Sequence, residues 1–190
     1  MGIDDLVRDL DWHPVSFVKI DVEGWEPQVL NGMRGLLSGA DAPALLYECN
    51  GHTLLPFDTH PEELVAAVER LGYTSYLVDD GRLIRVSSAD FQPQTLVDYL
   101  AVKSVPSAAG WQVEDELSLP ERMARIATDS SHANPAHRLF MARALERAGA
   151  LLAEPTVRET LERLRDDDDE AVRKASTWWD PATLPAESRR

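Results

Sequence analysis

An apolar run near the start of the chain constrains the fold most, because it ends in negative charge. Residues 15–22 are mostly apolar and rich in β-branched side chains, interrupted by Lys19 and closed by Asp21 and Val22. Such a run is typical of a strand that is covered on both faces of a parallel sheet. Glu23 and Glu26 follow directly. We therefore expect a buried strand whose carboxyl end carries several carboxylates.

Strand and helix patterns then alternate along the first half of the chain. Residues 27–37 have a helical apolar face and begin at a proline, which the first turn of a helix tolerates. Residues 43–49 form a second short apolar run. Residues 59–73 predict another helix, with Thr59 as N-cap and Glu62 as its capping-box partner. This alternation predicts two strands and two helices of an α/β sheet.

An antiparallel edge completes the expected sheet. Residues 74–86 contain two strand patterns around Asp80-Gly81, a strong hairpin signal. Residues 98–104 predict a last strand. The sequence thus predicts an α/β fold whose sheet is mixed, carrying an antiparallel hairpin at its edge, over residues 1–105.

The second half of the chain has only helical patterns. We expect a linker over residues 106–118, an all-α extension over residues 119–180 and a frayed tail over residues 181–190. Asn134-Pro135 and Pro155 mark two helix starts. Residues 166–169 are four consecutive aspartates, which point in different directions and lack the spaced ligands and glycine of a calcium loop. They predict a loop that caps the next helix, and no metal ligand is assigned anywhere.

Composition excludes several classes of partner and compartment. The 190 residues carry a net charge of −14, which argues against nucleic acid and anionic membrane as partners. No apolar run approaches the ~20 residues of a membrane span, and the N-terminus lacks the features of a signal peptide. Cys49 is the single cysteine, which excludes a disulfide framework. These features predict a cytoplasmic protein.

Candidate functional residues lie where the first two strands end. Glu48 closes the second strand pattern as Asp21 and Glu23 close the first. If the strands are parallel neighbours, their carboxyl ends form the rim where α/β proteins bind ligands. The ordinary alternative is that acids at strand ends cap the next helix, and Glu26 before Pro27 fits that role.

These residues resemble a known family. Residues 17–37 and 43–50 are similar to the fourth and fifth strand region of the FkbM family of S-adenosylmethionine-dependent methyltransferases. Residues 2–10 resemble the short helix before that strand, and residues 72–86 and 98–104 resemble the terminal hairpin region. The positions that carry the resemblance are Lys19-Ile20-Asp21, Glu23-Gly24, Glu26, Leu30, Gly32 and Glu48.

The resemblance implies part of a class I methyltransferase (Rossmann-like) sheet and methyl transfer from S-adenosylmethionine to a hydroxyl of a small molecule or glycan. Asp21 and Glu23 would be catalytic, either as base or as orienting acceptor, and Asp21 would also face the cofactor. Glu48 and His52 would bind the acceptor, although His52 is also an ordinary loop histidine. The other four histidines receive no role.

The family's donor-binding features are missing from the sequence. No GxGxG-like turn occurs in it, and only about fourteen residues precede the first strand. The resemblance implies that family strands four, five, seven and six lie side by side, which leaves the first strand of this chain with an open edge. We therefore expect the second half of a methyltransferase domain, weak binding of S-adenosylmethionine, and as partner a second copy or a complementing N-terminal half.

The helical extension supports an alternative function. Residues 134–176 weakly resemble HEAT-like repeats, which present interaction surfaces. The chain would then be a non-catalytic interaction module derived from a methyltransferase fold. A helical cap packed on the sheet domain is the simpler interpretation, because too few repeats fit for an independent solenoid. Trp178 and Trp179 are expected either as packing anchors or as an exposed end.

Overall fold

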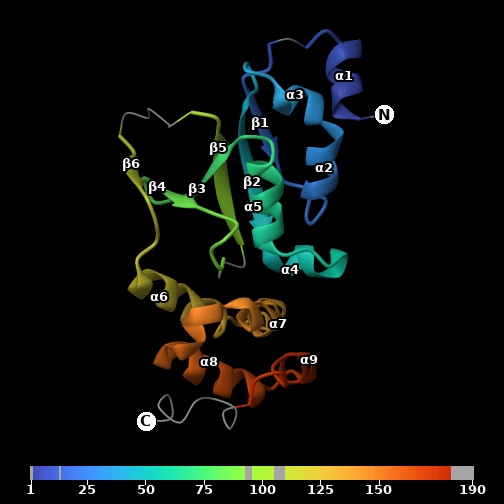
Figure 1. Ribbon diagram of the computed structural model, residues 1–190. Coiled ribbons are helices and arrows are strands. Elements are labelled where there is room, and N and C mark those ends of the chain that lie inside the picture. The colour runs from blue at the N-terminus through green and yellow to red at the C-terminus, as the bar shows by residue number, and fades with distance from the viewer. Residues whose placement is uncertain (1, 13, 93–95, 105–109, 181–190) are drawn as a thin grey trace. The chain divides into compact units, whose positions relative to one another are not determined.

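The computed structural model describes residues 2–12, 14–92, 96–104 and 110–180 (Figure 1). The chain divides into two compact units, with the boundary between Leu117 and Ser118, close to the predicted start of the helical extension at residue 119. The predicted tail, residues 181–190, lies outside the described residues. Among the described helices, none is both long and apolar enough to cross a membrane.

The first unit is built from a sheet and five α-helices within the described residues. In chain order its elements are α1 (Ile3–Asp9), β1 (Phe17–Ile20), α2 (Glu26–Gly32), α3 (Arg34–Ser38), β2 (Ala44–Asn50), α4 (Gly51–Leu54), the short 3₁₀ helix η1 (Leu55–Phe57), α5 (Pro61–Glu69), β3 (Thr74–Asp79), β4 (Arg82–Val86), β5 (Leu96–Val102) and β6 (Gln112–Glu114).

The sheet is mixed, with six described strands in the order β1-β2-β5-β3-β4-β6. β1 and β2 are parallel, β5 runs antiparallel to both β2 and β3, and β4 is antiparallel to β3. Asp80 and Gly81 turn the β3–β4 hairpin with positive φ angles of 39° and 80°. The α/β prediction, the hairpin and the side-by-side order β1-β2-β5-β3 are confirmed. β1 has a single strand neighbour among the described strands, so it forms an edge.

Three local predictions were wrong. The helix expected over residues 27–37 is two helices that meet at Met33, and the Asp4 carboxylate caps the second by accepting from Gly35 and Leu36 N–H groups at 2.7 and 2.8 Å. The N-cap of α5 is His60 rather than Thr59, because Glu63 rather than Glu62 reaches back to it. The expected linker contains β6, which extends the sheet by pairing with β4.

One face of the sheet holds the hydrophobic core of the first unit. Alternate residues of β2 and β5 point into it, and α2, α3 and α5 contribute the opposing apolar side chains. Cys49 is buried in this core, and burial raises the pKa of its thiol well above the ordinary value. The opposite face of β1 and β5 is open at its ends, where Phe17 and Leu96 are 52% and 53% exposed.

The second unit is helical, as predicted. Its elements are α6 (Leu119–Asp129), α7 (Pro135–Ala144), the short 3₁₀ helices η2 (Leu145–Arg147) and η3 (Gly149–Ala153), α8 (Pro155–Arg165) and α9 (Glu170–Ala175). The Asn134 side chain caps α7, and Asp169 caps α9 by accepting from two backbone N–H groups, which confirms the capping role of the acidic run. Trp179 is buried and the Trp178 indole donates to the Ala142 carbonyl, so both are packing anchors.

A nearly buried ion pair fixes the loop between α8 and α9 to α7. Arg138 donates two parallel hydrogen bonds to the Asp167 carboxylate, at 2.8 and 2.9 Å, and two more to the carbonyls of His132 and Ala133. The Arg138 hydrogen bonds hold the pKa of Asp167 below its ordinary value. Folding therefore gains stability from Asp167 above pH 3.8, and loses it as the pH falls through the lowered pKa.

Replacing Arg138 tests this arrangement. Arg138→Leu leaves the nearly buried Asp167 charge without its partner, so the free energy of unfolding should fall by about 2–3 kcal/mol. Arg143→Leu on the exposed side of the same helix is the matched control and should change it by less than about 0.5 kcal/mol. Urea titration at pH 7 followed by circular dichroism measures both. Equal effects of the two variants would contradict the prediction.

Candidate functional site

Three carboxylates meet at the carboxyl ends of β1 and β2. Asp21, Glu23 and Glu48 each place one oxygen so that all three atoms lie within 4.8 Å of one another. The parallel register, which sets Ile20 opposite Tyr47, explains this: both strands end at the same edge of the sheet. The sequence predicted this convergence. We call these three residues the acid cluster.

A fourth acid, Glu26, shapes the loop that carries Glu23. Its side chain is 1% exposed, and its carboxylate accepts from the N–H groups of Val22 at 3.2 Å and Gly24 at 3.0 Å. The expectation that Glu26 caps the following helix is therefore wrong: it occupies the first position of α2 and bonds to the loop instead. Within that loop Glu23 has a φ of 53°, a left-handed conformation that is uncommon for a residue with a Cβ.

The same loop packs closely on the segment that follows β2. Gly24 has a φ of 102°, and a Cβ added there would lie 2.4 Å from the Thr53 carbonyl oxygen. Trp25 contacts Phe57 edge to face, with 5.6 Å between ring centroids. Because these contacts join the loop after β1 to α4 and η1, they keep Glu23 beside the end of β2.

More polar residues share the sheet face of Glu48. Alternation along β2 places Asn50 on that face, and the register with β5 sets Asp98 opposite Glu48. Asn50 is 6% exposed and its amide N–H group donates to Glu23 at 3.4 Å. Lys19 of β1 lies two residues before Asp21 and forms an ion pair with it at 2.9 Å. The cluster therefore sits in a polar, mostly acidic corner of the sheet.

Charge crowding affects the protonation of Glu48. Partial burial raises the pKa of Glu48 above its ordinary value, and the neighbouring charges of Asp21, Glu23 and Asp98 raise it further. Lys19 has the opposite surroundings: its hydrogen bond to Asp21 raises the pKa of the ammonium, which keeps it charged. One lysine thus faces a group of acids that repel one another.

His52 lies in α4, two residues after Asn50, and is half-buried. It is not one of the residues whose ligand atoms form the acid cluster. Sequence reasoning missed Asn50 and Asp98. The signal for Asn50 was its position directly after the Glu48-Cys49 pair, on the same strand face as Glu48. For Asp98 no local signal exists, because its proximity comes from pairing with a distant strand.

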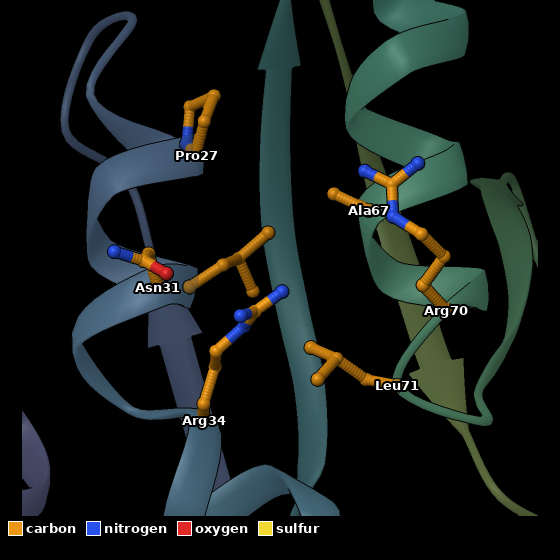
Figure 2. A pocket seen from close by; sticks show the side chains of 7 residues that line it. Pro27, Asn31, Arg34, Ala67, Arg70 and Leu71 are labelled. Atoms are coloured by element: carbon orange, nitrogen blue, oxygen red, sulfur yellow. The ribbon is translucent and has the colours of Figure 1, made fainter.

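A separate hollow of about 210 Å³ lies between α2 and α5, lined by seven residues (Figure 2). Arg34, Arg70, Leu30 and Leu71 are among the residues that line it. It includes none of the cluster residues. Both arginines are exposed, and the hollow is an open groove between two helices on the core face of the sheet.

Comparison with known proteins identifies no relative. No protein-family model, curated protein or solved structure matches the chain. Function is therefore inferred from the residues of the site and from the strand arrangement.

Substitution of Gly24 tests whether its close contact holds the loop. Gly24→Ala combines a positive φ with a clash against a backbone oxygen, and we expect a loss of roughly 2–3 kcal/mol in the free energy of unfolding. Gly72→Ala is the matched control, because its φ is 85° but no atom lies within 4 Å of the added Cβ. It should lose only about 1 kcal/mol. Denaturant titrations measure the difference, and similar losses would show that the contact with Thr53 is unimportant.

Removing the Glu48 charge should stabilise the fold. The raised pKa means that the ionised carboxylate is disfavoured in the folded state, so the penalty is absent below pH 4.5 and complete above the raised pKa. Because Glu48 is partly exposed, we expect Glu48→Gln to raise stability by less than about 1 kcal/mol at pH 8 and by nothing at pH 4. Thermal unfolding at the two pH values measures this, and a destabilised variant at pH 8 would refute it.

Proposed function

We propose that the chain is the acceptor-side half of an S-adenosylmethionine-dependent methyltransferase, which transfers a methyl group to a hydroxyl of a small molecule or glycan. The observation that carries the proposal is the acid cluster at the carboxyl ends of a parallel strand pair. In α/β sheets this edge is where ligands bind and where catalytic residues gather. The residues of the cluster are also among those that carry the resemblance to the FkbM family.

The strand arrangement supports the same proposal. The order β1-β2-β5-β3, with β5 antiparallel to its neighbours, agrees with the order that the resemblance implies for family strands four, five, seven and six. Strand order alone supports a fold rather than a reaction. The proposal therefore needs both the arrangement and the side chains at its edge.

The chemistry asks little more of the protein than alignment and proton removal. The sulfonium of the donor is a good leaving group, so the enzyme must position the acceptor oxygen and accept its proton. Asp21 and Glu23 are the candidates for base or orienting acceptor, and the negative charge of Asp21 would favour the positive sulfonium. Glu48, with its raised pKa, and His52 would contact the acceptor.

In this proposal, the residues that bind the donor and the residues that bind the acceptor lie on different segments or chains, a division of labour between two halves. The sequence has no glycine-rich turn to hold the adenosine and amino-acid parts of the donor. β1 has an open edge among the described strands, and such an edge accepts another strand. We therefore infer that the donor-binding half is supplied by a further segment or by a second chain, and that this chain alone binds S-adenosylmethionine weakly.

Methyl transfer is the direct test. Calorimetry on the chain alone should show no micromolar binding of S-adenosylmethionine. The chain extended by a donor-binding half, either fused to it or added as a second chain, should bind the donor and transfer its tritiated methyl group to polyol or glycan hydroxyls. In that form Asp21→Asn should lower the rate by about 10²-fold or more, as expected for loss of a general base.

Glu116→Gln is the control for this assay, because it removes one exposed charge just after β6, at the far edge of the sheet from β1. It should leave the rate unchanged. Micromolar binding by the isolated chain would refute the division of labour. Full methyl transfer by Asp21→Asn would refute the role of that carboxylate, and an extended, folded form that neither binds the donor nor transfers the methyl group would refute the function.

The second candidate is a non-catalytic interaction module. It is favoured by the second unit, which has its own buried core. Residues 134–176 of this unit weakly resemble HEAT-like repeats. Trp179 is buried and the Trp178 indole donates a hydrogen bond within the same unit, so these two tryptophans do not form an exposed binding surface. The same assay separates the candidates, since a pure interaction module never transfers a methyl group.

A further inference from the structure

Two hydrogen-bond acceptors, one in the acid cluster and one beside it, are buried and have no partner within the described part of the chain. They are Glu48 Oε1 and Asn50 Oδ1, and each is closed to solvent. Leaving a buried acceptor unsatisfied costs about 1–3 kcal/mol, more when it is charged. Native structures therefore pair such atoms with a donor, a water or an ion. The two atoms belong to alternate residues of one strand, so a single partner is a natural explanation for both.

Asn50 is directed toward the cluster rather than toward the core. Successive side chains of β2 point to opposite faces of the sheet, and Tyr47 and Cys49 point into the core, so Asn50 points to the other face. The Asn50 amide nitrogen donates to Glu23 at 3.4 Å, so the side chain is aimed at the cluster, and the amide oxygen is bonded to the same carbon. With only 6% of the residue exposed, this oxygen is a buried acceptor that neighbours carboxylates.

The acid cluster has more negative groups than the described cations around it can pair. Among the described residues Lys19 pairs with Asp21, whereas no cation pairs with Glu23 or Glu48. Asp98 adds another negative charge opposite Glu48. Hydrogen-bond donors of the protein satisfy only part of the set, namely the Asn50 N–H group on Glu23 and the Lys19 ammonium on Asp21. Carboxylate and amide oxygens together form the ligand set of a hard divalent cation.

We propose that Asp21, Glu23 and Glu48 bind a divalent cation of the size of Ca²⁺, with the Asn50 amide oxygen as the fourth protein ligand. Three carboxylate oxygens within 4.8 Å of one another are close enough to bind one ion. Ca²⁺ accepts irregular sites built from carboxylate and amide oxygens, whereas Mg²⁺ demands a near-ideal octahedron and releases its waters reluctantly.

The inference goes beyond methyl transfer, because it concerns binding of a metal ion alone by the chain as it stands. If both hold, Asp21 and Glu23 serve as ligands of the ion rather than as the base. The bound cation would then bind an acceptor hydroxyl and lower its pKa, which helps the proton removal. The metal experiment below uses neither S-adenosylmethionine nor an acceptor, so its failure leaves the proposed function standing, and the reverse also holds.

The test is calorimetry and thermal unfolding of the full chain with CaCl₂ alone. We expect one Ca²⁺ bound with a Kd of roughly 0.1–1 mM, typical of partly exposed sites, and a melting temperature raised by a few degrees at 10 mM. Mg²⁺ should bind several-fold more weakly. Glu23→Gln and Glu48→Gln should each weaken Ca²⁺ binding at least tenfold, while Glu116→Gln, which removes the same charge at the far edge of the sheet, should leave it unchanged.

Three results would overturn the proposal. The first is the absence of saturable Ca²⁺ binding up to 10 mM. The second is an equal stabilisation by NaCl at matched ionic strength, which would reduce the effect to screening of the acids. The third is equal loss in Glu116→Gln and in the cluster variants. Glu48→Gln keeps the proposal testable if Glu23→Gln fails to fold, because relief of charge crowding stabilises that variant, and circular dichroism confirms the fold of each.

Discussion

The parallel pairing of β1 with β2 decides where the acids of the first unit meet. A parallel pair needs a crossover, which α2 and α3 provide, and the crossover brings both carboxyl ends to one edge. Had the strands been antiparallel, Asp21 and Glu48 would lie at opposite ends. Every other feature of the site, from the buried Glu26 to the contact of Gly24 with Thr53, refines a position that this pairing has already set.

Three residues of the site have an unfavourable conformation, charge or unsatisfied hydrogen-bond acceptor, and contacts with the surrounding structure maintain them. Glu23 has a left-handed backbone, Glu48 an unfavourable charge, and Asn50 an unsatisfied oxygen. Such features persist only where neighbouring contacts fix them, and they concentrate at functional sites. Here the fixing contacts are Glu26 on the loop amides and Trp25 on Phe57. The backbone of this site is thus held by several contacts and its charge is mostly negative, a combination that suits the binding of a positive ligand.

Local signals were sufficient for much of the fold. The β3–β4 hairpin follows from Asp80-Gly81, and the start of α7 from Asn134-Pro135, because each signal acts within a few residues. The sequence also predicted that Asp21, Glu23 and Glu48 would meet, since strand ends can be identified from the pattern alone.

The features that were missed depend on residues far apart in the chain. The break at Met33 depends on a cap from Asp4, and the position of Asp98 depends on pairing with β2. β6 is three residues long and forms only because β4 offers an edge. The shift of the α5 cap to His60 is a smaller matter of which glutamate reaches back. No periodicity in a single segment encodes the contacts made across the sheet.

The pairing of β2 with β5 has a consequence for the order of folding. This pair joins Asn50 to Leu96 and Leu45 to Ala101, and the whole of α4, α5 and the hairpin lies between the two strands. Closing such a long loop delays the centre of the sheet, whereas the β3–β4 hairpin and the helices of the second unit form from neighbouring residues. The site would therefore assemble late during folding, after the hairpin that supports β5 and after much of the helical unit has formed.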